Sequence, residues 1–287
     1  MLQVILHGSD EAAGATGAAG ELGIEEALGG VSWAILPTPL RQFSLGRYDV
    51  SVRYLPAETG SRVGGDWYDA RLGADGSAVV AIGDVAGHGV AAAAGMARIG
   101  NALSGLSVTG QPASTLLGWL NRLVCADEVP ERVASAVVCV LDQARPALRW
   151  AQAGHLPPVL VSCGEARPLP RPFGVLLGSA PNAEYGLAYE QLTAGDILFC
   201  YTDGLIERRG RDIDEGLAGL LAAAAGCQRE TADDALIALF DRLEPPATDD
   251  DVCVLAIRVN QRALPRTGGG TGRGTSPGRA GRERRRC

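Results

Sequence analysis

Four short segments of the 287-residue sequence place aspartate at the end or the start of an apolar run. In one of them a strand-like run, 79–83, ends at Asp84, after which small residues lead into a helical pattern; the other three are 64–66, 201–204 and 249–252. Because a strand end holds a side chain in a fixed position, these segments predict a cluster of carboxylates. Two carboxylates about 4 Å apart repel by roughly 4 kcal/mol at an effective dielectric constant of ~20, so the cluster requires protons or cations. Hard divalent ions such as Mg²⁺ or Mn²⁺ suit ligands that are all oxygen atoms.

The hydrophobic periodicity predicts strands and helices in separate groups along the chain. Period-2 alternation is typical of a strand with one buried face, whereas apolar residues spaced three and four apart indicate an amphipathic helix. We expect strands at 48–54, 66–71, 77–84, 133–141, 147–153, 159–162, 197–201 and 252–259, and helices at 87–106, 113–125, 215–225 and 231–243. This order contains no βαβ alternation and therefore predicts an α+β fold in which helices are segregated from antiparallel sheets.

All 26 basic residues are arginine, because the sequence contains no lysine. The absence of lysine excludes a P-loop phosphate site, Schiff-base chemistry and a kinase-type lysine. The net charge of −7 is unevenly placed, since residues 261–287 hold eight Arg and one Glu (+7), which leaves −14 for residues 1–260. So acidic a body argues against general binding of nucleic acids.

Composition divides the chain into three predicted regions. Residues 1–45 are expected to be a flexible N-terminus with a weak connector helix at 24–35, residues 46–260 a folded domain, and residues 261–287 a disordered tail rich in Arg and Gly. No apolar run approaches the ~20 residues that span a bilayer, and the start lacks a signal-peptide pattern, so we expect a cytoplasmic protein without membrane contact. Seven cysteines without a CxxC pair predict free thiols.

Five segments, in their order and spacing, resemble the motifs of a known family. They are 63–69 (VGGDWYD), 82–89 (IGDVAGHG), 153–155 (AGH), 195–204 (GDILFCYTDG) and 249–252 (DDDV). Together they resemble the metal-dependent serine/threonine phosphatases of the type-2C (PPM) superfamily, in the bacterial branch named after stage II sporulation protein E. The resemblance covers about residues 31–260, and five motifs in family order are far more specific than any one alone.

The resemblance implies a catalytic domain built as an α-β-β-α sandwich, two packed antiparallel sheets flanked by helices, with two Mn²⁺ or Mg²⁺ ions at one edge. By this resemblance, Asp84 would bridge both ions and the backbone carbonyl of Val85 would bind one of them. Asp203 and Asp250 would hold the second ion, and Asp66 would lie beside the first, as a ligand or through bound water. Such an ion pair activates a shared water for in-line attack on phosphorus, so no phosphoenzyme is needed.

Each acid also has a purely structural interpretation. An isolated Asp84 before a helix would be a helix N-cap, and Asp203 would be a turn residue. These interpretations explain less than a shared site does. In the triple aspartate, alignment by the following strand makes Asp250 the ligand by this resemblance. Asp251 is then the neighbour that other members of the superfamily fill with asparagine, and Asp249 is expected to face solvent.

The histidines near the motifs are expected to be structural. The offset of His88 from the bridging aspartate argues against a role as general acid. His155 is expected to fix a loop near the site by hydrogen bonding, and Gln152, where the branch commonly has asparagine, should affect the geometry of that loop rather than metal binding. Trp67 and Tyr68 are expected to pack in the core.

The leading hypothesis is a phosphatase that hydrolyses phosphoserine or phosphothreonine on a regulatory protein, which in the resembling branch is typically an anti-sigma-factor antagonist. Because few residues precede the first predicted strand, we expect no sensor domain in this sequence. Its input would be a partner protein, dimerisation through 24–35, or nothing at all. The alternative is a catalytically silent phosphatase-fold binding module in a partner-switching pathway, but such modules lose acids that are all present here. A third class, nucleic-acid or acidic-partner binding, rests on the arginines at 279–286 alone, and such runs are usually solvated. We therefore expect no nucleic-acid partner.

Overall fold

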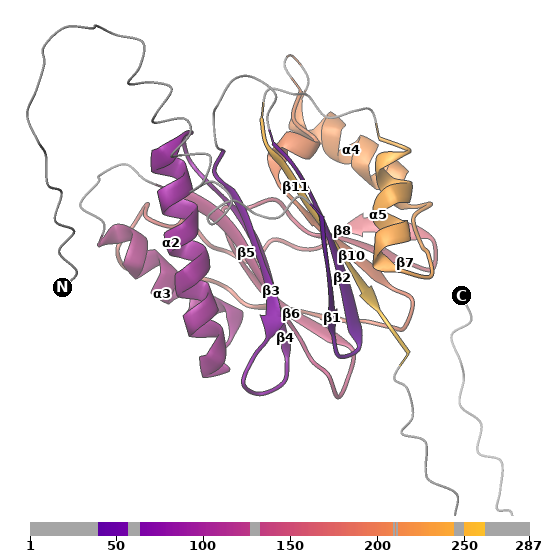
Figure 1. Ribbon diagram of the computed structural model, residues 1–287, viewed down its shortest axis with the longest axis horizontal. Helices are drawn as coiled ribbons and strands as arrows, with labels where there is room; N and C mark the ends of the chain where they lie inside the picture. The colour runs from indigo at the N-terminus through magenta and orange to yellow at the C-terminus, as the bar shows by residue number, and fades with distance from the viewer. Residues whose placement is uncertain are drawn as a thin grey trace, which may run out of the picture. The chain divides into compact units, whose positions relative to one another are not determined.

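Two antiparallel β-sheets lie at the centre of the protein (Figure 1). The computed structural model describes residues 40–56, 64–126, 133–208, 210, 212–243 and 250–261, all within one compact unit, residues 37–287. The first sheet has the order β1 (Leu40–Leu45), β2 (Tyr48–Leu55), β11 (Val252–Val259), β10 (Ile197–Tyr201), β7 (Val159–Ser162) and β8 (Glu165–Pro168). The second has the order β3 (Asp66–Leu72), β4 (Ala78–Val85), β5 (Ala134–Leu141), β6 (Ala147–Ala153) and β9 (Ala188–Gln191).

The inner faces of the two sheets form a shared hydrophobic core. Successive side chains of a strand point to opposite faces, so alternate residues of β2 (Tyr48, Val50, Val52 and Tyr54) all enter this core, as the period-2 pattern predicted. From the other sheet, Ile82 of β4 and the fully buried Trp150 of β6 pack into the same cluster. The burial of these large side chains holds the sheets in fixed alignment.

Two pairs of helices cover the outer faces of the sandwich (Figure 1). Helices α2 (Val90–Leu106) and α3 (Ala113–Cys125) contact β3 to β6, and α4 (Ile213–Ala224) and α5 (Ala232–Phe240) contact the first sheet. Small residues let α2 approach closely, because a Cβ on Gly95 would lie only 3.0 Å from Cγ1 of Val85. The predicted α-β-β-α sandwich is thereby confirmed.

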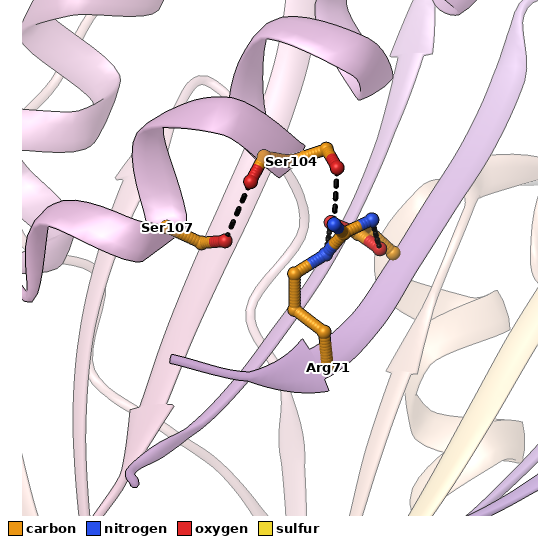
Figure 2. A network of polar contacts seen from close by, with 4 residues as sticks. Arg71, Ser104 and Ser107 are labelled. Carbon is orange, nitrogen blue, oxygen red and sulfur yellow. Dashed lines mark hydrogen bonds and ion pairs between the residues drawn. The ribbon is translucent and has the colours of Figure 1, made fainter. Parts of the chain in front are cut away.

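A polar network fixes the C-terminal end of α2 to strand β3 (Figure 2). The guanidinium of Arg71 pairs with both carboxylate oxygens of Asp69, each at 2.7 Å, and also donates to the hydroxyl of Ser104 in α2. One turn later, the hydroxyl of Ser107 donates to the Ser104 carbonyl at 2.8 Å. This network supplements the apolar packing between the helix and the sheet.

Three short or edge strands lie outside the predicted elements. β1 falls in the region expected to precede the folded domain, yet it pairs with β2 along its whole length. β8 and β9 are four residues each and mostly exposed, so they carry no buried face that a hydrophobic pattern could report. The proposed connector helix at 24–35, Asp249 and residues 262–287 lie outside the described residues.

Among the cysteines that the structure describes, five are free thiols, as expected: Cys125, Cys139, Cys200, Cys227 and Cys253. Cys163, on the exposed turn between β7 and β8, is disulfide-bonded, so the expectation of free thiols throughout was wrong at this position. In the part of the chain that the structure describes, no helix combines the length and apolarity needed to cross a bilayer.

Candidate functional site

The acid-bearing segments meet at one edge of the sandwich because of the antiparallel topology. β3 starts where its partner β4 ends, so Asp66 lies directly opposite Asp84 in the strand register. In the other sheet, β10 ends beside the start of β11, which brings Asp203 near Asp250. Both strand pairs therefore place their acids at the same edge of the sandwich, one pair from each sheet.

The hydroxyl of Thr202 joins the two sheets at this edge. It donates to Oδ2 of the buried Asp66 at 2.7 Å and accepts the backbone N–H of Cys253 at 2.9 Å. Asp66 belongs to the second sheet, whereas Thr202 and Cys253 belong to the first. One buried side chain thus fixes the position of an aspartate of one sheet relative to two strands of the other.

Gly65 leaves room for a cradle of oxygen atoms. Its backbone carbonyl accepts the Val85 N–H at 3.1 Å, and a Cβ at this position would lie 2.0 Å from the Val85 carbonyl oxygen and 2.5 Å from Oδ1 of Asp84. Any larger residue would displace these oxygens. The glycine therefore allows a carboxylate and a carbonyl of consecutive residues to lie together against the backbone.

Asp250 and Asp251 have different environments. Asp250 is exposed, whereas Asp251 is buried and its Oδ2 accepts a 2.5 Å hydrogen bond from the Tyr54 hydroxyl. Gly64 packs directly on the same carboxylate, because a Cβ there would lie 1.7 Å from Oδ2. Asp251 is thus tied into the core, and Asp250 is the carboxylate of this pair that solvent and ions can reach.

Burial and mutual repulsion raise the pKa values of the clustered acids. Burial raises the pKa of Asp84 to about 7, and the charges of Asp203 and Asp250 add to the shift. Burial also raises the pKa of Asp66 well above its usual range, with the Asp84 charge as the next cause. The pKa values of Asp203 and Asp250 are raised as well, mainly by burial for Asp203 and by partial burial of the carboxyl group for Asp250, whose residue is exposed as a whole. The carboxylates therefore lie close enough to oppose one another's ionisation, which is the situation that bound cations relieve.

The donor set suits hard divalent ions, although the side chains do not form a closed cage. Within the described ranges, no three acidic, histidine or cysteine side chains lie close enough together to enclose a metal ion. The groups gathered at the edge are carboxylates and the carbonyl beside Gly65, all of them oxygen donors. Oxygen ligands of this kind suit Mg²⁺ or Mn²⁺, whereas zinc sites usually contain cysteine sulfur or histidine nitrogen.

A cavity of about 460 Å³ opens beside these acids. Its lining includes Asp84, Ser135, His155, Arg171, Asp203 and Asp214. A volume of this size accommodates a small phosphoester or one side chain of a protein substrate. Of the predicted site residues, Asp84 and Asp203 face this cavity, whereas Asp66 and Asp250 are not among its lining residues.

His155 holds the floor of this cavity in place, in agreement with its expected structural role. Its Nδ1 lies 2.7 Å from the Ser135 hydroxyl and its Nε2 lies 3.1 Å from the Tyr201 carbonyl. Burial lowers the pKa of His155 to about 4, so the ring is neutral at pH 7, with Nε2 donating to the carbonyl and Nδ1 accepting from the hydroxyl. Gln152 closes the same loop by donating to the carbonyls of His155 and Leu156.

The remaining candidate side chains also lie where their structural roles require. His88 is exposed and is not among the lining residues of the cavity. Trp67 is buried against Gly83, where a Cβ would lie 2.7 Å from the indole ring, and Tyr68 packs on the core between the sheets. Both aromatic residues therefore contribute to packing, as expected.

Sequence reasoning did not identify several residues of the site. The alternation pattern placed Tyr54 on the buried face of a strand, but it gave no indication that the Tyr54 hydroxyl donates a hydrogen bond to Asp251. Ser135 and Asp214 lie in no recognisable motif. Arg171 stands between two prolines, and this local sequence gave no signal that it lines the cavity.

Several known proteins are similar to this chain in sequence and fold. Protein IcfG of Synechocystis sp. (strain ATCC 27184 / PCC 6803 / Kazusa) is 22% identical over 253 residues, covering 77% of this chain and 39% of that protein. The structure of the RsbU and RsbW domains of Rv1364c from Mycobacterium tuberculosis is 31% identical with a TM-score of 0.68, covering 76% of this chain and 62% of that one. The chain thus spans about two fifths of IcfG and less than two thirds of the Rv1364c structure.

Two further solved structures share the fold. RsbX in complex with magnesium is 17% identical with a TM-score of 0.61, covering 77% of this chain and 100% of that chain. The PP2C phosphatase domain and regulatory fragment of the cell fate determinant SpoIIE from Bacillus subtilis is 20% identical with a TM-score of 0.59, covering 74% of this chain and 64% of that one. At these identities the similarity shows the fold alone.

Membership of a family rests on the sequence match over most of the folded domain. The family model described as Stage II sporulation protein E (SpoIIE) matches residues 74–260, well over half of the chain. The matched range contains Asp84, Asp203 and Asp250, and the resemblance drawn from the five motifs is thereby confirmed. The chain belongs to the Stage II sporulation protein E (SpoIIE) family.

Proposed function

We propose that the chain is a metal-dependent protein phosphatase that hydrolyses phosphoserine or phosphothreonine on a regulatory protein by means of metal-activated water. One observation carries the proposal: aspartates from both sheets meet at an edge where Asp84 and Asp203 line a 460 Å³ cavity. The raised pKa of Asp84, about 7, supports it: burial is the largest cause, and the negative charges of Asp203 and Asp250 add to the shift, a repulsion that a bound cation would relieve.

In this proposal the metal ligands are Asp66, Asp84, the carbonyl oxygen of Val85, Asp203 and Asp250. Two bound Mn²⁺ or Mg²⁺ ions would supply a water of lowered pKa and would offset the charge of the phosphoryl oxygens. The chain positions the donors by its own contacts, since the Thr202 hydroxyl orients Asp66 and the bare backbone of Gly65 admits the oxygens of Asp84 and Val85.

The proposed substrate is a phosphoprotein, with an anti-sigma-factor antagonist as the most specific expectation from the branch that the motifs resemble. Similarity to the RsbU and RsbW domains of Rv1364c supports a protein partner of this regulatory kind. The proposed input is a partner protein or a homodimer formed through residues 24–35. The proposed domain limits are 46–260 for catalysis, with β1 of the preceding region paired onto this domain, and 261–287 for an Arg-rich tail.

The direct test measures hydrolysis of p-nitrophenyl phosphate and of a phosphoserine peptide by protein stripped with EDTA. Turnover should appear when Mn²⁺ or Mg²⁺ is restored and should disappear again with chelator. Asp203→Asn should remove nearly all of this activity, whereas Asp75→Asn, a matched change at an exposed turn, should preserve it. Full turnover by metal-free protein would contradict the proposal.

The same assay distinguishes the alternative function. A catalytically silent phosphatase-fold binding module would bind a phosphoserine peptide, measured by calorimetry, but would release no phosphate with any divalent ion. The presence of every acid in the proposed ligand set favours the active enzyme.

A further inference from the structure

The loop that joins β8 to the second sheet presents an arginine to the cavity. Arg171 lines the cavity together with Asp84 and Asp203. The other charged lining residue is Asp214, and the neutral ring of His155 adds no charge. Among the described lining residues, Arg171 is therefore the single cationic side chain beside three acidic ones.

The guanidinium of Arg171 is available to a ligand. Within the described part of the chain it makes no hydrogen bond and no ion pair, and the residue is exposed. Its charge also reaches the lining of the cavity, because it contributes to lowering the pKa of His155, whose Nε2 lies 3.1 Å from the Tyr201 carbonyl. Asp84, His155 and Asp203 line the same cavity as Arg171, so the guanidinium lies near the proposed reaction centre.

The backbone that carries Arg171 is fixed on both sides. Leu169 is buried and its N–H donates to the Pro158 carbonyl at 2.8 Å, and Leu177 exchanges two backbone hydrogen bonds with Ala134, at 2.9 and 3.1 Å. The flanking Pro170 and Pro172 restrict the backbone of the loop further.

Close packing holds the middle of the loop as well. Gly174 packs on the backbone of Gln152, where a Cβ would lie 2.1 Å from the carbonyl oxygen. The loop therefore needs little ordering when a ligand binds, and a side chain on a preorganised backbone loses less entropy on binding.

We propose that Arg171 is a substrate-binding residue whose guanidinium donates two N–H groups to the non-bridging oxygens of the phosphoryl group, an inference that rests on the proposed phosphatase function. The planar fork of arginine matches two phosphoryl oxygens at once, which a lysine ammonium cannot do. The competing role is electrostatic support of the acid cluster. That role predicts weaker metal binding after substitution, whereas phosphoryl recognition predicts weaker binding of substrate and phosphate at an unchanged metal requirement.

The test compares Arg171→Ala and Arg171→Lys with Arg145→Ala, an exposed arginine on the β5–β6 turn. For each protein, kcat and KM for p-nitrophenyl phosphate, the inhibition constant of inorganic phosphate and the Mn²⁺ concentration for half-maximal activity are measured. A charge-assisted hydrogen bond contributes enough for Arg171→Ala to lose about tenfold to a hundredfold in phosphate inhibition and in kcat/KM. Arg171→Lys should recover part of the loss, and Arg145→Ala should match the wild type.

Two results would overturn the inference while leaving the proposed function intact. One is an Arg171→Ala enzyme with wild-type KM and phosphate inhibition; the other is a loss fully restored by higher Mn²⁺, which would assign Arg171 to the acid cluster. If the wild-type protein shows no metal-dependent turnover, the proposed function fails. Calorimetry with inorganic phosphate in Mn²⁺ then decides about Arg171: binding that the alanine variant loses supports the inference, and equal binding by both proteins rejects it.

Discussion

Replacing Asp84 with asparagine should stabilise the metal-free protein at neutral pH while removing its activity. The folded environment raises the pKa of this carboxyl from 3.8 to about 7. An acid with a raised pKa does not lower the free energy of unfolding below pH 4; it lowers this free energy progressively between pH 4 and 7 and by the full amount above pH 7. At 1.36 kcal/mol per pKa unit the full cost is about 4 kcal/mol, and partial solvation of the side chain reduces this to about 2–4 kcal/mol.

The assay is urea unfolding in EDTA at pH 8 and at pH 5, for the wild type and for Asp84→Asn. The gain in unfolding free energy from the substitution should be about 2 kcal/mol larger at pH 8 than at pH 5, because most of the carboxyl is protonated in the folded protein at pH 5. Saturating Mn²⁺ should reverse the order, since the ions stabilise the charged wild-type cluster and bind the variant weakly.

The control is Asp75→Asn, which should act in the opposite direction. Hydrogen bonds from the Ser77 hydroxyl and N–H lower the pKa of Asp75, so its charged form stabilises the fold above pH 4 and the variant should be less stable at pH 8. An Asp84→Asn protein that is less stable than the wild type in EDTA, or a gain equal at both pH values, would show that charge repulsion does not dominate at this edge.

The remaining predictions concern packing, the bridge between the sheets and the tail. Gly65→Ala should lose about 1–3 kcal/mol of stability and most metal-dependent turnover, because its Cβ would overlap the Val85 carbonyl. Gly105→Ala on the open face of α2 should be neutral or stabilising by up to about 1 kcal/mol in thermal unfolding. Thr202→Val should lower the free energy of unfolding in urea by about 2–4 kcal/mol, because it leaves the buried Asp66 carboxyl group and the buried Cys253 N–H without their partner. Thr202→Ser keeps the hydroxyl and should retain most of the stability. Equal stabilities of the valine and serine variants would show that the hydroxyl does not contribute. Removal of residues 261–287 should leave kcat and KM for p-nitrophenyl phosphate unchanged, because β11 ends seven residues, or about 24 Å, from its acid-bearing end. A large loss of activity at every salt concentration would show that the catalytic domain extends beyond Asn260.

The parts of the fold that follow a local pattern were predictable. The alternation from Tyr48 to Tyr54 predicted a strand because one face of that strand packs on the other sheet. Strand-end positions predicted that Asp66 and Asp84 would come together, because antiparallel neighbours begin and end at the same edge. The sequence of a short exposed strand such as β9 shows no comparable alternation of apolar residues, because none of its residues is fully buried.

The contacts that depend on distances between sheets and loops were not predictable. The Thr202 hydroxyl reaches Asp66 across 136 residues of chain, and only the spacing of the packed sheets makes this contact possible. Arg171 reaches the cavity because its loop is pinned by Ala134 and Pro158, two residues that have no local sequence relation to it. A resemblance to family motifs identified the acids but not this cation.

The strand register also determines where the protein can be attached to other molecules without obstructing the cavity at its acid-bearing edge. β1 begins at Leu40 opposite Arg53, near the acid-bearing edge, whereas β11 leaves the sheet at Val259 opposite Tyr48, at the other end. A fluorescent protein or affinity tag joined directly to β1 would therefore lie at the end of the sheet that bears the acids. Immobilisation through the end of β11 on a sensor chip or resin would instead leave the cavity facing the solution, which makes the carboxyl side the better handle for capture experiments with phosphoprotein partners.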